Sequence, residues 1–316
     1  MRSGAMLSDG LARPFKTNNY AHTKAYALSI SDDITWSDWT LNLGVRHEDI
    51  EGSVNNKLLD VITENSQSIT APGLGLHRQL TEKMSLLAGV YVGFSPSGPG
   101  KSGAESEESI NIEYGVRYDD GQFSGEIIAF ESDYDNLLGR CRASDSDCQV
   151  GQEFSGGNVE VSGVEVFGQF QRSLSGGVIL ASQLNYTFSE SKFKGAFFSQ
   201  FSQWGLVEKG DELPYIPRHA GRWQVGLETD IWAIDVALKY QHGMREVPGS
   251  GQIADDLHTD SLTTLDASLT WFVNEQMDLR VLTRNLTDET AIVSHRPYGA
   301  RPNFPRTLMA QMKYRF

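Results

Sequence analysis

The twelve residues Pro305-Arg306-Thr307-Leu308-Met309-Ala310-Gln311-Met312-Lys313-Tyr314-Arg315-Phe316 decide the fold class of this chain. Counted back from Phe316, every second side chain as far as Leu308 is apolar or aromatic, and polar side chains fill the positions between them except at Met309. Successive side chains of a strand point to opposite faces of a sheet, whereas a helix would spread both sets around its circumference. The segment is therefore predicted to be a β-strand with one apolar and one polar face.

The same period of two recurs along almost the whole sequence, most clearly in 39–45, 110–118, 234–240 and 265–271. Its phase is ambiguous in 84–95 and in 122–136, and no segment has the pattern of an amphipathic helix. We predict about thirteen strands, near 20–36, 39–53, 67–80, 84–95, 108–119, 122–137, 158–172, 177–190, 218–230, 233–245, 261–273, 277–288 and 305–316.

The connections between these strands alternate between short and long. The short ones include Ser37-Asp38 and Asp120-Gly121, and the long ones are 54–66, 96–107, 138–157, 191–217, 246–260 and 289–304. Aromatic residues such as Trp36, Trp39 and Trp232 gather beside the short turns, as in an interfacial girdle. Long strands with short turns at one end and long loops at the other are typical of an antiparallel outer-membrane β-barrel. A soluble β-sandwich has shorter strands and no such asymmetry.

Composition narrows the class of protein further. The chain has 316 residues, a formal net charge of −14 and a pI near 4.9. No basic stripe is present, so a nucleic-acid partner is not expected. The longest apolar run, 86–94, is nine residues, whereas a membrane-spanning helix needs about 20. Helical membrane proteins are thus excluded, but β-barrels are not, because their alternating strands average out as polar.

Residues Met1–Gly10 contain no apolar core of a signal peptide. Either the protein is cytoplasmic or the chain begins inside a longer one, and the strand pattern favours the second alternative.

Several segments resemble the barrel of TonB-dependent outer-membrane receptors. The last twelve residues are similar to the last strand of that family, and Phe316 looks like the signal read by the barrel-assembly machinery. Asn285-Leu286-Thr287-Asp288 is similar to the family's Asn-Leu-Phe-Asp, with Thr287 in place of the usual Phe. Further resemblance lies in 93–100 with 109–118, and in 157–165. The segments 137–148 and 210–215 are similar to the ferric-dicitrate and siderophore receptor branch.

The resemblance implies that residues 1–316 are the C-terminal part of such a barrel, about thirteen of a probable 22 strands. The N-terminal plug domain and the TonB box of the family are not expected within these residues. The resemblance further implies a place in the outer membrane, in contact with its lipid. It also implies uptake of a ferric chelate, a siderophore or ferric citrate, driven by the TonB system through the plug.

Ligand contacts are expected on the polar face and in the long loops. On our phase assignment, cationic side chains point into the lumen at Arg46, Arg117, Lys239, Arg280, Arg284, Lys313 and Arg315. They could hold an anionic chelate, or they could form lumenal salt bridges with Glu48, Glu113, Asp235, Asp266 and Asp278. Loop 289–304 is basic and aromatic in an acidic protein, and His295, Arg296, Tyr298 and Arg301 are its candidate ligand contacts.

The two cysteines, Cys141 and Cys148, fall in a loop that we place outside the cell, where oxidising conditions favour a disulfide between them. A metal-binding pair is the alternative, although no histidine or third cysteine lies nearby in sequence. We find no nucleophile elbow, no complete phosphate loop and no histidine ligand pair on a helix. An enzymatic activity, a catalytic residue, a bound metal and a cofactor are therefore not expected.

Three alternatives to the receptor reading stay open at this point. A passive porin would conduct ions without a plug. A barrel enzyme such as a phospholipase would need a serine and histidine pair at the lipid-facing rim, which our phase assignment does not offer. A soluble β-protein would explain neither the long strands nor the alternating loops.

Overall fold

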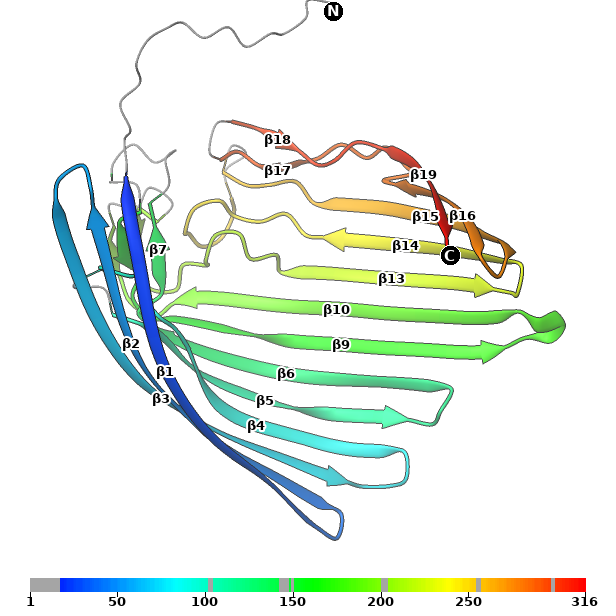
Figure 1. Ribbon diagram of the computed structural model, residues 1–316, viewed down its shortest axis with the longest axis horizontal. Coiled ribbons are helices and arrows are strands. Elements are labelled where there is room, and N and C mark those ends of the chain that lie inside the picture. Colours follow the sequence, from blue (N-terminus) through cyan, green and yellow to red (C-terminus); the bar gives the residue numbers. More distant parts are fainter. Residues whose placement is uncertain are drawn as a thin grey trace, which may run out of the picture.

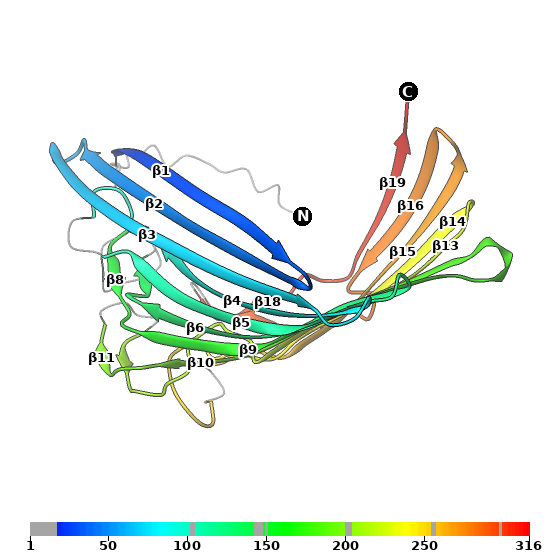
Figure 2. The ribbon, with the colours of Figure 1, turned by 90° about the horizontal axis from the view of Figure 1, so that it is seen from below.

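A single antiparallel sheet of thirteen strands forms the body of the computed structural model (Figure 1). The structure describes residues 18–101, 105–141, 148, 151–199, 204–253, 257–296 and 299–316. The strands of the sheet, in their spatial order, are β1 (Asn19–Trp36), β2 (Trp39–Asn56), β3 (Val61–Gln79), β4 (Met84–Ser95), β5 (Glu107–Asp119), β6 (Phe123–Asp135), β9 (Val159–Ser173), β10 (Ile179–Phe193), β13 (His219–Glu228), β14 (Trp232–Gln241), β15 (Leu262–Asn274), β16 (Met277–Arg284) and β19 (Thr307–Tyr314). The sheet curls into a trough whose two edges are β1 and β19 (Figure 2).

The thirteen strands predicted from the sequence are confirmed, with one clear error at the β2–β3 connection. We expected a long loop over 54–66, but β2 continues to Asn56 and β3 already starts at Val61. Val54 pairs with Thr63, and Asn56 pairs with Val61, so the connection shrinks to a turn at 57–60. The ladder extends because Val61 and Ile62 favour strand structure and the backbone groups find partners. Long and short connections therefore do not alternate strictly.

Three of the long connections contain small hairpins of their own. They are β7 (Leu138–Arg140) with β8 (Glu153–Ser155), β11 (Phe197–Phe198) with β12 (Leu206–Val207), and β17 (Ile292–Ser294) with β18 (Arg301–Pro302). A 3-10 turn, η1 (Ser175–Gly177), joins β9 to β10 at the short-turn end. The hairpins satisfy backbone hydrogen bonds that an irregular loop of the same length would leave to water.

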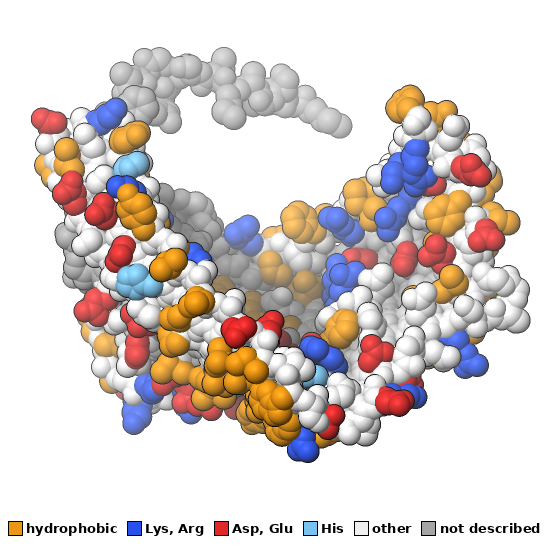
Figure 3. Space-filling view, turned by 60° about the horizontal axis from the view of Figure 1, so that its bottom comes forward, with side chains coloured by type: hydrophobic (Ala, Val, Ile, Leu, Met, Phe, Trp, Pro, Cys, Tyr) orange, Lys and Arg blue, Asp and Glu red, His pale blue; other side chains and the backbone are white. Residues whose placement is uncertain are grey.

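The two faces of the sheet differ sharply in polarity. Trp223, Leu238 and Leu265 are neighbours across β13, β14 and β15, and they belong to an apolar band on the convex face. Trp223 is 52% exposed and Leu238 40%. The concave face is polar, and Figure 3 shows lysine and arginine side chains gathered on the inside of one wall. Large apolar side chains exposed in such numbers need a nonaqueous neighbour, which a bilayer provides.

In the described part of the chain the buried apolar cluster lies at the long-loop end of the sheet. Val159, Phe193, Trp204 and Val207 pack together at the long-loop end, where β9 and β10 meet the β11–β12 hairpin. Trp204 also lies against Gly156, where an added Cβ would approach the indole to 2.7 Å from Cζ3. This cluster holds the loops against the mouth of the trough.

No helix in the described ranges is both long enough and apolar enough to span a membrane.

Close packing of strands on the concave face makes one glycine sensitive to substitution. A Cβ at Gly163 in β9 would overlap the carbonyl oxygen of Phe188 and come within 2.7 Å of the Phe130 ring. We expect Gly163→Ala to destabilise the barrel by about 1–3 kcal/mol, because overpacking must displace the backbone or the ring. Urea unfolding of the protein in detergent measures the change.

Gly44→Ala is the matched control, since the nearest atom to its added Cβ is Ser31 Cβ at 3.7 Å, an ordinary contact. Equal unfolding midpoints for the two variants would contradict the packing of β9 against β10.

Candidate functional site

A cationic cavity lies on the concave wall formed by β13 to β16. Its volume is about 670 Å³, and Val293, Asn303 and Phe304, from β17 and the segment before β19, line it from the loop side. Four cationic side chains and two carboxylates contribute to its wall, namely Arg222, Lys239, Arg280, Arg284, Asp235 and Asp266. The cavity therefore carries an excess of positive charge.

The two carboxylates of the cavity compensate only part of this positive charge. Lys239 Nζ lies 2.6 Å from Asp266 Oδ2, which neutralises one pair. Arg280 donates to Ser268 Oγ at 3.0 Å, and Ser268 in turn donates to Asp235 at 3.3 Å. Arg222 donates to the amide oxygen of Gln224 at 2.7 Å rather than to a carboxylate. Guanidinium groups held in this way present further donors to an anion in the cavity.

Two of the arginines predicted to face the lumen lie on other parts of the concave wall. Arg46 on β2 is paired with Glu48 two residues along the same strand. Arg117 on β5 donates to Glu126 of β6 at 2.8 and 3.0 Å. The structure thus groups Arg284 with Lys239 and Arg280, but it does not bring Arg46 or Arg117 to the cavity. Arg315 pairs with Asp278 at 2.8 Å, one of the salt bridges considered from the sequence.

A buried carboxylate ties three loops together at the mouth of the trough. Glu246, which is 2% exposed, follows β14 and accepts three hydrogen bonds. The backbone N–H of His295 donates to Oε1 at 2.7 Å, and His295 Nδ1 lies 2.7 Å from Oε2. The Tyr215 hydroxyl, from the segment before β13, donates to Oε1 at 3.0 Å. Glu246 therefore fastens the β17–β18 hairpin to the barrel rim.

Burial alone would raise the pKa of Glu246, but the hydrogen bonds from His295 and Tyr215 outweigh it and hold that pKa below its ordinary value of 4.5. Burial is also the largest reason why the pKa of Tyr215 lies above 10.0, and the hydrogen bond to Glu246 adds to it. At neutral pH the arrangement is thus a carboxylate with a protonated tyrosine.

The β17–β18 hairpin carries the loop residues proposed from the sequence. The His295 ring is hydrogen-bonded to Glu246. Arg296 lies close enough to Tyr215 for its positive charge to lower the pKa of the Tyr215 hydroxyl. Arg301 is exposed on β18, opposite Ser294. Tyr298 lies outside the described residues. The hairpin therefore carries cationic residues, and its Val293 lines the cavity together with Asn303 from the segment that follows it.

Comparison with known proteins identifies this architecture. The family model described as TonB dependent receptor-like, beta-barrel, matches residues 3–286. The chain belongs to this family. The membership places the sheet in the outer membrane, with its apolar convex face toward lipid.

Solved receptor structures share the fold at low sequence identity. The ferric citrate transporter FecA in its unliganded form is 21% identical, with a TM-score of 0.74. The matched region covers 99% of this chain and 48% of the FecA chain. The ferric-catecholate import receptor Fiu from E. coli K12 is 18% identical, with a TM-score of 0.74 and coverages of 95% and 46%. The ferric yersiniabactin uptake receptor FyuA from Yersinia pestis is 20% identical, with a TM-score of 0.68 and coverages of 94% and 47%. The chain thus spans about half the length of the receptors it matches.

The Asn285–Asp288 motif of the receptor barrel fixes the loop before the last strand. Asn285 is 3% exposed and adopts a left-handed conformation with φ 50°. Its Nδ2 donates to the carbonyl oxygens of Glu289 at 2.8 Å and Phe304 at 3.1 Å, and its Oδ1 accepts from the Glu289 N–H. Asp288 accepts from the backbone N–H of Arg306 at 3.2 Å. An asparagine suits this position because its short amide tolerates positive φ while bonding to backbone groups.

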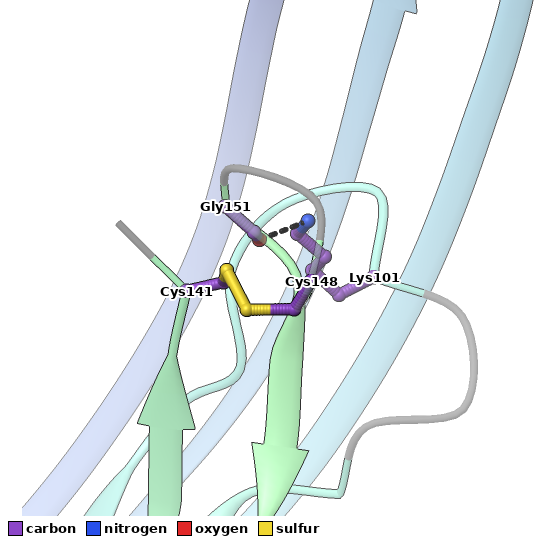
Figure 4. The surroundings of a disulfide bond; sticks show 4 residues. All are labelled: Lys101, Cys141, Cys148 and Gly151. Carbon is purple, nitrogen blue, oxygen red and sulfur yellow. Dashed lines mark hydrogen bonds between the residues drawn. A yellow bond between two sulfur atoms is a disulfide. The ribbon is translucent and has the colours of Figure 1, made fainter. Parts of the chain in front are cut away.

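Cys141 and Cys148 form a disulfide in the receptor's β7–β8 connection, with a Cα–Cα distance of 6.2 Å (Figure 4). Lys101 from the β4–β5 connection reaches the carbonyl oxygen of Gly151 beside it. Since neither cysteine is free, they do not offer a thiolate metal pair.

Sequence reasoning missed three residues of the site. Arg222 could have been found, because it occupies the polar phase of β13 and pairs in register with Lys239. Glu246 carried no signal, and Tyr215 was noted only as the end of the resembling segment 210–215, since both lie in loops where no periodicity operates.

Proposed function

We propose that this chain forms part of the pore wall and outer loops of a receptor that takes up a ferric chelate across the outer membrane. The observation that carries the proposal is the cationic cavity on β13 to β16, lined in part by a hairpin that carries further cationic groups. Carboxylate-rich ferric chelates are anionic, and guanidinium groups bind carboxylates through paired hydrogen bonds. The names of FecA, Fiu and FyuA, which all refer to ferric ligands, support this substrate class.

In this proposal the residues bind the ferric chelate and release it, and no covalent step takes place. Arg280 and Arg284 attract the chelate into the lumen, while Arg296 and Arg301 meet it at the mouth. The energy for release comes from the TonB system, from which the family takes its name. That energy reaches the barrel through a plug domain. Ferric iron is the cargo of this process, and no catalytic residue or resident cofactor takes part.

Two further assignments belong to the same proposal. Residues 1–316 act as one barrel portion, and the C-terminal Phe316 serves as the signal for the barrel-assembly machinery. Phe316 is fully exposed, and its ring lies edge-on to Tyr314 with centroids 5.2 Å apart. This leaves its aromatic side chain accessible to an assembly factor.

The double variant Arg296→Ala/Arg301→Ala tests the outer part of the site. We expect it to weaken binding of ferric citrate to the purified receptor by about 30-fold or more, because each of the two lost charge-assisted contacts contributes on the order of 1–2 kcal/mol. Titration followed by intrinsic tryptophan fluorescence gives the dissociation constant. Arg172→Ala, at the opposite end of β9, is the control for loss of positive charge. An unchanged constant in the double variant would remove the hairpin from the site.

A passive channel is the second candidate function, and it makes an opposite prediction. A porin would admit ferric citrate in cells without a functional TonB system. If uptake of ferric citrate stops when TonB is removed, the passive channel is excluded.

A further inference from the structure

One part of the concave wall is apolar, although the concave face as a whole is polar. Met309 of β19 interrupts the alternation of the last strand, and its side chain falls on the concave face directly opposite Leu282 of β16. Leu282 in turn lies opposite Ser268 of β15, in the wall of the cationic cavity. Both apolar side chains are half-buried. Because this face is turned away from lipid, the patch calls for an apolar contact other than the bilayer.

The cationic cavity therefore has two chemically different sides. Arg222 of β13 and Lys239 of β14 lie opposite each other in register and belong to the charged side. Leu282, Val293 and Phe304 contribute apolar side chains from β16, β17 and the segment before β19. A volume of about 670 Å³ is in the range of pockets that hold small organic ligands. This lining suits a ligand with an anionic part and an apolar part better than a purely carboxylate one.

Phe304 presents its ring to this cavity from a fixed backbone. Its side chain is 89% exposed, so it contributes little to the packing of the protein. Its carbonyl oxygen, by contrast, accepts hydrogen bonds from Asn285 Nδ2 and Asn303 Nδ2, each at 3.1 Å. Pro305 follows, and its ring also restricts the backbone conformation of Phe304. A large apolar ring that is held in place and yet almost uncovered is available to a ligand.

A ligand group that matches both sides of the cavity is an aryl oxygen bound to iron, as in a catecholate or a phenolate. Its oxygen carries negative charge at the edge of an aromatic ring, where a guanidinium reaches it. The face of the same ring is left for stacking on another aromatic ring. Arg280 and Arg284 flank Leu282 along the concave face of β16, so charged donors and an apolar surface alternate over successive inward positions.

We propose that Phe304 makes this cavity select chelates whose iron ligands are aryl oxygens over chelates with carboxylate ligands alone. The inference rests on the proposed function, because it assigns the substrate class of the same cavity. The aryl ring stacks on Phe304 and packs against Leu282, while its oxygens accept hydrogen bonds from Arg280 and Arg284. A carboxylate chelate still binds through the arginines but gains nothing from the Phe304 ring. Phe304 is thus a specificity-determining residue, and it forms no bond to the iron.

A pair of metal complexes with equal charge and different ligands tests the proposal. Chromium(III) tris(catecholate) and chromium(III) tris(oxalate) are both trianions with octahedral oxygen coordination, and both exchange ligands too slowly to change during the measurement. Equilibrium dialysis against the purified receptor in detergent, with chromium measured by atomic absorption, gives both dissociation constants. Dialysis against micelles without receptor corrects for partition into detergent. We expect the wild type to bind the catecholate complex about tenfold more tightly, and Phe304→Ala to lose this preference by weakening the catecholate complex alone.

Phe304→Trp should retain the preference, because it keeps an aromatic face at the same position. Phe198→Ala is the matched control, since Phe198 is also strongly exposed but lies on β11, away from the residues that line the cavity. An unchanged preference in Phe304→Ala would overturn the inference, and so would an equal loss of affinity for both complexes. Equal affinity of the wild type for the two complexes, with loss of both in Arg280→Glu/Arg284→Glu, would overturn it and leave the proposed function standing. Binding of neither complex by the wild type would overturn both.

Discussion

Reversing two charges in the lumenal cavity, with Arg280→Glu/Arg284→Glu, is expected to weaken ferric citrate binding by about a hundredfold or more. The wild-type cavity sets four cationic side chains against two carboxylates, and the variant sets two against four. Each lost charge-assisted hydrogen bond contributes about 1.5–3 kcal/mol to binding, and the new carboxylates repel the anion. Equilibrium titration of the receptor in detergent measures the change.

The pair Arg46→Glu/Arg117→Glu controls for the general field of the lumen. It makes the same change in net charge on β2 and β5, away from the cavity, and it also leaves Glu48 and Glu126 without partners. We expect a loss of severalfold at most from this control, since charges beyond a Debye length are screened. If both double variants lost affinity equally, the cavity would not be the binding site and a diffuse lumenal field would explain the result.

Removing the carboxylate of Glu246 is expected to release the β17–β18 hairpin from the barrel rim. Glu246→Ala leaves the donors of His295 and Tyr215 without their acceptor, and breaking a buried pair of this kind destabilises the local structure by about 3–5 kcal/mol. Hydrogen exchange of 291–303, followed by mass spectrometry, should then become much faster than in the wild type. Exchange in the sheet strands should remain unchanged.

The same carboxylate gives the hairpin a pH dependence with a defined sign. The pKa of Glu246 is lowered in the folded protein, so its stabilising contribution is fully present above the unfolded value of 4.5. The contribution is lost as the pH falls through the lower, folded pKa. Hairpin exchange in the wild type should therefore rise only below pH 4.5, toward the rate of Glu246→Gln.

Glu212→Gln is the matched control, because Glu212 also pairs with a loop residue, Arg245, at 2.7 Å but its side chain is 48% exposed. Glu212→Gln should change the hydrogen-exchange rate of the β17–β18 hairpin only slightly. Unaltered hairpin exchange in Glu246→Ala would show that other contacts hold the hairpin.

The sequence by itself determined the strands and their faces. Alternation such as that of 308–316 has only one physical solution, a sheet with one apolar and one polar side, and the short turns fix antiparallel neighbours. The faces of Arg46, Arg117 and Arg284 follow from that alternation, and Cys141 and Cys148 are paired in the structure as the sequence suggested. Where the pattern gave no period, at 54–66, the prediction of a loop was wrong, because strand pairing beyond the apolar band depends on the partner strand.

Only the tertiary structure decided which lumenal cations form one cavity and which loop residues meet. Alternation gives the face of a side chain, but strand register and sheet curvature decide its neighbours, so Arg284 joins Lys239 whereas Arg46 turns to Glu48. Tyr215, Glu246 and His295 are separated by 31 and 49 residues and lie in loops without periodicity. Their contact arises because the barrel wall brings three loop ends to one rim, and a buried carboxylate there must find its donors.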